Sequence, residues 1–142
     1  MNRYFEQMVL TASPVELIRL LYQKAIDSTR KARENMRSGH IAERSAAITN
    51  VYLILGELMA SLQPEDAPEL ASRLQSLYAY MQSRLLEANR SQQDQPLADV
   101  LGILVTLAEP WAELERALAT HPNGWSAGSP PVTQSARVAY SA

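Results

Sequence analysis

The chain has 142 residues and a formal net charge of −2, so it lacks the basic surface that nucleic-acid binding requires. With no cysteine it can form no disulfide or thiolate metal site, which is compatible with a reducing cytosol. The first six residues lack the apolar core of a secretory signal, and the longest wholly apolar run, Val51 to Leu55, is far too short to cross a membrane. We expect a single cytoplasmic domain with no nucleic-acid partner and no membrane insertion.

An arm of residues 1–12 precedes the first predicted helix. It mixes aromatic and apolar side chains, including Tyr4 and Met8, in a proportion that a purely disordered segment would not have. Two interpretations stay open: the arm packs on its own domain, or it also covers a binding surface reversibly. The arm ends at Ser13, which can cap a helix, with Pro14 at the first helical position and Glu16 placed to complete a capping box.

Four amphipathic segments follow, over residues 14–37, 41–62, about 67–89 and 97–118, with apolar residues at heptad-like spacing. Asp66 and Glu69 suggest a capping box for the third segment, and Pro110 predicts a kink or a break in the fourth. Short loops between helices favour an antiparallel up-down arrangement. The sequence therefore predicts an all-α, four-helix bundle over residues 1–120, followed by a flexible C-terminal tail, residues 121–142, rich in Gly, Pro and Ser.

Residues for catalysis or metal binding are missing from the expected positions. A di-metal bundle needs Glu-x-x-His pairs, but the two histidines, His40 and His121, lie beside predicted loops and no Glu precedes either by three residues. The sequence also lacks phosphate-binding Gly-rich loops, the Gly-x-Ser-x-Gly motif and the His-Glu-x-x-His motif. We therefore expect no enzyme activity, no metal and no cofactor.

The apolar residues exceed what one core stripe per helix requires. The second helix carries a second stripe with Val51, Ile54 and Leu58, and the fourth carries another with Val100, Ile103 and Leu107. Exposure of each such side chain would cost roughly 1.5–3 kcal/mol, so something must cover it. One interpretation is a groove for an apolar helix or an extended peptide; the other is a core beneath the arm and the adjacent helices.

Two segments have distinctive patterns: Thr11 to Ile18 with Leu21-Tyr22, and Leu77 to Met81 followed by Arg84-Leu85. Both resemble signatures of the flagellar secretion chaperone FliS family. The resemblance covers roughly residues 4–118 and implies a cytoplasmic four-helix bundle that binds the C-terminal segment of flagellin. Such a chaperone prevents premature polymerisation, keeps flagellin competent for secretion and delivers it to the flagellar export gate. Pro110 departs from the family pattern, and the tail after His121 lies outside the resemblance.

Two candidate binding surfaces stay open: the second stripe of the second helix, and the face of the third helix that carries Tyr80 and Arg84. The arm is expected to occupy part of either surface when no partner is bound. Alternatives are a homo-oligomeric structural bundle and a flagellar regulator without chaperone activity. The residues expected to bind the partner are Tyr4, Met8, Val51, Ile54, Leu58, Leu77, Tyr80 and Arg84.

Overall fold

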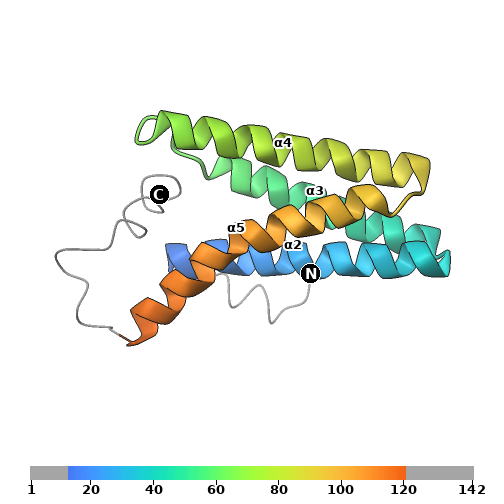
Figure 1. Cartoon of the computed structure of the whole chain (residues 1–142), viewed down its shortest axis with the longest axis horizontal. Coiled ribbons are helices and arrows are strands. Elements are labelled where there is room, and N and C mark those ends of the chain that lie inside the picture. The colour runs from blue at the N-terminus through green and yellow to red at the C-terminus, as the bar shows by residue number, and fades with distance from the viewer. Residues whose placement is uncertain (1–12, 121–142) are drawn as a thin grey trace.

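A computed structural model describes residues 13–120, and this range consists of four α-helices and their connections (Figure 1). The helices are α2 (Pro14–Ser38), α3 (Ile41–Ala60), α4 (Pro68–Ser91) and α5 (Gln95–Thr120). The arm and the tail expected from the sequence, including Tyr4 and Met8, lie outside the described residues. Their predicted roles stay predictions.

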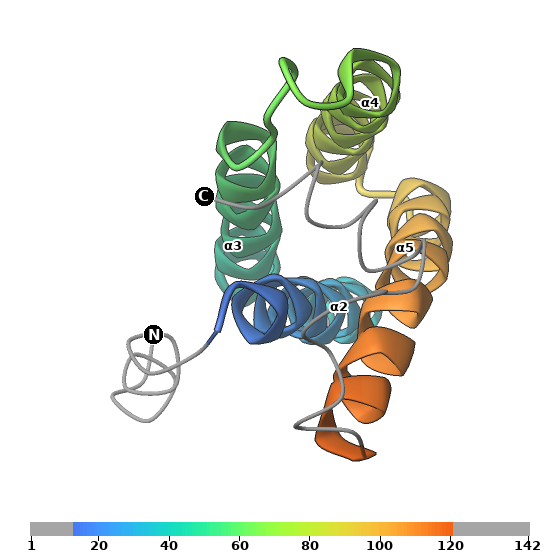
Figure 2. The same ribbon diagram turned by 90° about the vertical axis from the view of Figure 1, so that its left-hand side faces the viewer.

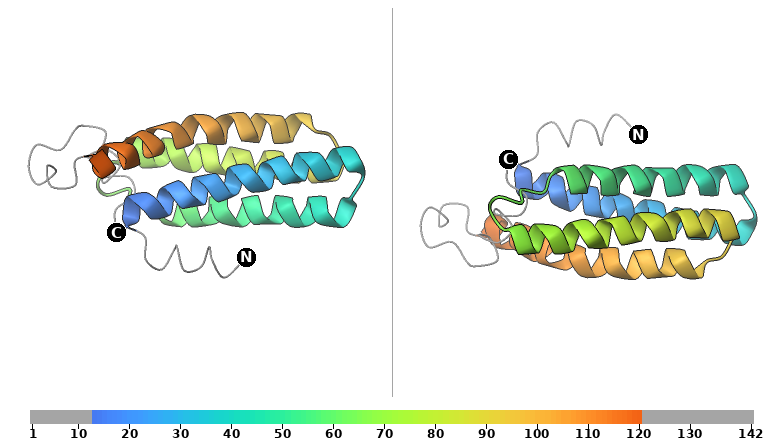
Figure 3. Two further views of the ribbon diagram at one scale, coloured as in Figure 1. Left: turned by 90° about the horizontal axis from the view of Figure 1, so that it is seen from below. Right: turned by 90° about the horizontal axis from the view of Figure 1, so that it is seen from above.

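Viewed along the long axis of the bundle, the four helices are arranged in a ring. Each packs against its neighbour in the chain, and α5 closes the ring by packing against α2 (Figure 2). Successive helices run in opposite directions (Figure 3). The predicted all-α, antiparallel up-down four-helix bundle is confirmed.

The start of α2 has the capping box that the sequence predicts. The Ser13 hydroxyl accepts from the Glu16 amide at 3.2 Å, and the Glu16 carboxylate accepts from the Ser13 amide at 3.3 Å. The helix ends at Gly39, whose φ of 74° is left-handed and therefore suits a residue without a Cβ. Both ends of α2 are thus set by local sequence.

One local prediction is wrong, and a second is wrong in part. Asp66 does not cap α4, because Pro68 takes the first helical position and places Ala67 at the cap, with no side-chain hydrogen bond. Pro110 does not break the fourth helix, since α5 continues from Gln95 to Thr120 with this exposed proline inside it. The alternative prediction, a kink at Pro110, stays a prediction.

The core lies inside the ring and draws apolar side chains from all four helices. Across it, the hydroxyls of Tyr22 on α2 and Tyr78 on α4 form a buried hydrogen bond of 2.6 Å. This bond joins two helices that are not adjacent in the ring. The fully or nearly fully buried side chains of α3 are Arg44, Ala47, Ile48, Val51, Ile54, Leu55 and Leu58.

The second stripe of α3 is therefore core. Val51 and Leu58 have no exposed surface, and Ile54 is 8% exposed. The expectation that a bundle helix needs one buried stripe was wrong, because α3 packs against both α2 and α4 and each contact requires its own stripe.

Candidate partner-binding groove

An open groove of about 490 Å³ runs along the surface between α4 and α5. Leu77 forms its α4 side, and its floor and far wall come from α5. The α5 residues that line it are Ala98, Asp99, Gly102, Ile103, Thr106 and Leu107. The groove is therefore built from aliphatic side chains, with a single carboxylate at one end.

The sequence of α5 explains why this groove stays open. Residues 100–108 carry no charge, and within this run Val100 and Leu104 point into the core and are fully buried. Ile103 and Leu107 are only partly buried beside them. At Gly102 a Cβ would meet no atom within 4 Å, so this glycine leaves a low point in the helix surface. Of the second stripe of α5, Val100 is therefore covered by the core, while Ile103 and Leu107 are covered only in part.

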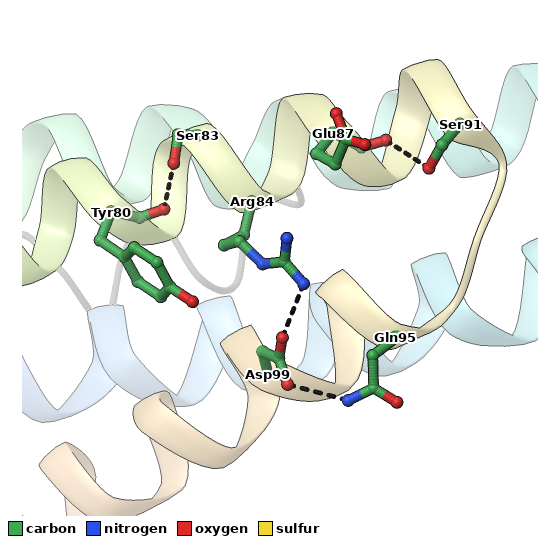
Figure 4. Close-up of polar contacts among 7 residues, drawn as sticks. All are labelled: Tyr80, Ser83, Arg84, Glu87, Ser91, Gln95 and Asp99. Carbon is green, nitrogen blue, oxygen red and sulfur yellow. Dashed lines mark hydrogen bonds and ion pairs between the residues drawn. The ribbon is translucent and has the colours of Figure 1, made fainter.

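An ion pair closes one end of the groove and ties α4 to α5. A guanidinium N–H of Arg84 donates to Asp99 at 2.8 Å, and Gln95 donates to the other Asp99 oxygen at 2.9 Å (Figure 4). The hydrogen bonds from Arg84 and then Gln95 lower the pKa of Asp99, and the same bond raises the pKa of Arg84. Both groups are therefore charged at neutral pH.

Arg84 retains unused hydrogen-bonding capacity at this position. Its Nε is buried and has no hydrogen-bond partner among the described residues. A buried N–H without a partner is unfavourable, so this atom adds nothing to the stability of the Arg84–Asp99 pair. Tyr80, one turn earlier on α4, is 48% exposed and points toward the same region (Figure 4). The groove thus has aromatic and polar groups beside its aliphatic floor.

The structure brings together three of the residues expected from the sequence. Leu77, Tyr80 and Arg84 lie along the side of α4 that faces α5. The other described candidates are in the core: Val51 and Leu58 have no exposed surface in the folded bundle, and Ile54 has little. Binding through that stripe is untested and would require the helices to separate.

The contribution of α5 to the groove was missed. Ile103 and Leu107 stand out in the sequence as a second apolar stripe, but nothing in the spacing distinguishes an open stripe from a covered one. Gly102 within an uncharged run was the available signal, because a glycine in a helix interior costs about 1 kcal/mol relative to alanine. In the structure Gly102 lines the groove, where the missing side chain leaves the space open.

Other kinds of site find no support in residues 13–120. No group of three or more His, Asp or Glu side chains in this range could hold a metal ion. Within the same range, every helix is too short or too polar to span a membrane. The arrangement is suited to holding an apolar segment.

The described residues form an all-α four-helix bundle with an open, largely aliphatic groove between α4 and α5. The family model described as "Flagellar protein FliS" matches residues 1–118. The chain is 34% identical over 110 residues to the flagellar secretion chaperone FliS of Salmonella typhimurium, covering 77% of this chain and 82% of that protein. It is 36% identical over 106 residues to the flagellar secretion chaperone FliSB of Pseudomonas aeruginosa, covering 75% and 84%. The Escherichia coli FliS is 30% identical over 109 residues, covering 76% and 80%. The chain belongs to the FliS family of flagellar secretion chaperones.

Proposed function

We propose that this protein is a cytoplasmic export chaperone that binds the C-terminal segment of flagellin in the groove between α4 and α5. Holding that segment prevents premature polymerisation and keeps flagellin competent for secretion, after which the chaperone delivers it to the flagellar export gate. Family membership supports the chaperone role. The observation that carries the site is the open aliphatic groove formed by Leu77, Ile103 and Leu107.

The composition of the groove suits a disordered apolar partner. Aliphatic side chains provide burial energy of about 25 cal/mol for each Å² removed from water, without requiring a fixed backbone geometry. A partner that folds on binding loses conformational entropy, so the apolar contact must be extensive. Asp99 and the Thr106 hydroxyl also line the groove beside the aliphatic side chains. Together these features favour an extended or helical peptide over a small molecule.

This site can be tested by a substitution that fills the groove, the replacement of Gly102 on α5 by tryptophan. We expect Gly102→Trp to fold, because the backbone is an ordinary helix and the added Cβ meets no atom within 4 Å. The indole would occupy the space of the peptide. In calorimetric titration with the C-terminal peptide of the same organism's flagellin, affinity should fall at least tenfold, which is about 1.4 kcal/mol.

Gly102→Ala is the matched control, because a methyl group leaves most of the groove open. This variant should bind the peptide as wild type does and should raise the free energy of unfolding by about 0.5–1 kcal/mol through its better helix propensity. Circular dichroism melts of all three proteins establish that they are folded. Wild-type affinity in a folded Gly102→Trp protein would place the flagellin site elsewhere.

A further inference from the structure

A second groove, of about 300 Å³, lies on the opposite flank of α5, against α2. Its apolar surface is formed by Ile26 of α2 and by Val105, Ala108 and Ala112 of α5. Val105 is 41% exposed, so part of this apolar surface is in contact with water. The last turns of α5 extend past α2, which makes this flank accessible from outside (Figures 1 and 2).

Two charged side chains of α5 also line this groove. Glu109 and Arg116 are both exposed, and neither forms an ion pair with a residue in the range 13–120. Glu109 can accept a hydrogen bond, and Arg116 offers a cation to the face of an aromatic ring. A tryptophan side chain combines a large apolar ring with a single N–H donor, and its ring is the best aromatic partner for a cation. The groove therefore suits an indole better than an aliphatic side chain.

The sequence supplies an indole shortly after the end of α5. The helix ends at Thr120, and the chain continues through Pro122 and Asn123-Gly124 to Trp125. The residue before a proline disfavours the helical conformation, and Asn-Gly is a turn signal, so this sequence favours a change of direction directly after the helix. Ala112 lies eight residues before Thr120, about 12 Å along the helix axis at 1.5 Å per residue. Five extended residues span at most about 17 Å, which is enough to bring Trp125 back to Ala112.

We propose that Trp125 of the C-terminal tail occupies the groove between α2 and α5 of its own chain. The indole ring packs on Ile26 and Ala112, its N–H donates to Glu109, and the guanidinium of Arg116 lies against the ring face. Because Trp125 is only five residues from the end of α5, the ring reaches the groove at a high effective concentration.

This contact is separate from the groove between α4 and α5. Leu77, Ile103 and Leu107 line the other flank of α5, so the tail leaves that groove open. The family model matches residues 1–118, so the segment that carries Trp125 lies outside the sequence shared with the family. The tail contact is therefore a property of this chain, and it can fail while peptide binding is retained.

Tryptophan fluorescence tests the contact in the full-length protein. The chain has two tryptophans, and Trp111 is buried in the core, so a Trp111→Phe variant reports on Trp125 alone. Its emission should lie to the blue of that of a synthetic peptide of residues 119–131. Adding Val105→Asp places a charge in the groove, so it should shift the emission to the peptide value and at least double the acrylamide quenching constant.

Leu53→Asp on α3 is the matched control, because this leucine is 60% exposed and lies outside the groove. It should leave the emission of Trp125 unchanged. Circular dichroism melts establish that the variants are folded. A folded Trp111→Phe protein whose emission and quenching equal those of the peptide would overturn the proposal.

Disulfide trapping provides a second test in which both tryptophans stay in place. The chain has no cysteine, so Ser126→Cys can be combined with a single cysteine on α5. Under mild oxidation, the bond within one chain should form roughly tenfold faster with Ala112→Cys than with Glu113→Cys, its exposed neighbour outside the groove. Mass spectrometry measures both products.

Adding Trp125→Ser to each pair should make the two rates equal, because the tail then loses the side chain that holds it in the groove. Equal rates already with Trp125 present would overturn the proposal. So would a preference for Ala112→Cys that survives Trp125→Ser, or a product of doubled mass that forms faster than the bond within one chain.

Discussion

Helices α3 and α5 look alike in sequence, since each carries a core stripe and a second apolar stripe beside it. In the structure their second stripes differ in part: Val51 and Leu58 are fully buried, whereas in α5 only Val100 is fully buried and Ile103 and Leu107 are partly buried at the edge of an open groove. Both helices have two neighbours in the ring. What differs is how closely the neighbour approaches, because α3 packs tightly on α2 while α4 and α5 are the least closely packed adjacent pair. Apolar stripes of similar sequence can therefore be closed into the core in one helix and left partly open in the other.

Replacing one leucine by alanine in each of the two stripes should give the largest difference in the free energy of unfolding. Leu58→Ala removes a fully buried side chain, so the free energy of unfolding should fall by about 2–5 kcal/mol. Leu107→Ala should cost about 1 kcal/mol or less, because the side chain is partly in water and leaves no closed cavity. Urea denaturation measures both values. Equal losses would remove the distinction between the core stripe and the groove stripe.

Flagellin peptide affinity of the same two variants should show the reverse order. Leu107→Ala should weaken binding, while a Leu58→Ala protein that remains folded should bind as the wild type does. A comparable loss of peptide affinity in both variants would indicate that the α3 stripe also takes part in binding.

The buried hydrogen bond between Tyr22 and Tyr78 should also contribute to the free energy of unfolding. Tyr78→Phe removes one partner of the 2.6 Å bond to Tyr22 and should cost about 1–2 kcal/mol, since a buried hydroxyl loses that bond. Tyr22→Phe with Tyr78→Phe should cost less than the sum of the two single changes, because both hydroxyls are then gone. Strict additivity of the unfolding free energies would show that the two hydroxyls are not coupled.

A smaller contribution to the free energy of unfolding is expected from the ion pair at the connection between α4 and α5. Arg33 of α2 donates twice to Asp94, at 2.8 and 2.7 Å, and this hydrogen bonding lowers the pKa of the Asp94 carboxyl. Because the folded-state pKa is lowered, the stabilisation is full above the ordinary pKa and is lost as the pH falls through the folded-state value. Both side chains are partly exposed to solvent, so the contribution at pH 7 should not exceed about 1 kcal/mol.

Comparing wild type with Asp94→Asn in urea at several pH values tests this assignment. The difference between them should be constant near neutrality and should shrink below about pH 4, the region in which aspartate titrates. A difference that grows on acidification would contradict the assigned sign. Asp99, at the groove, also has a lowered pKa because it accepts hydrogen bonds from Arg84 and Gln95.

The sequence by itself determined the elements whose causes are local. Ser13, Pro14 and Glu16 start α2, Gly39 ends it, and heptad-like spacing with short loops specifies four helices in an up-down order. Local signals failed where two of them competed, as when Pro68 displaced Asp66 from the cap of α4. They also overstated the effect of Pro110, because the helix is not divided into two segments there.

Only the tertiary structure decided which apolar stripe is covered. Periodicity shows that Leu58 and Leu107 each lie on a face of a helix, but the distance to the neighbouring helix depends on all four helices packing at once. The same holds for pairs such as Arg84 with Asp99 and Tyr22 with Tyr78, which lie on different helices and meet only when the ring closes. Local spacing carries no information on those distances, and for this reason the sequence predicted the bundle and the α4 side of the groove but missed the α5 side.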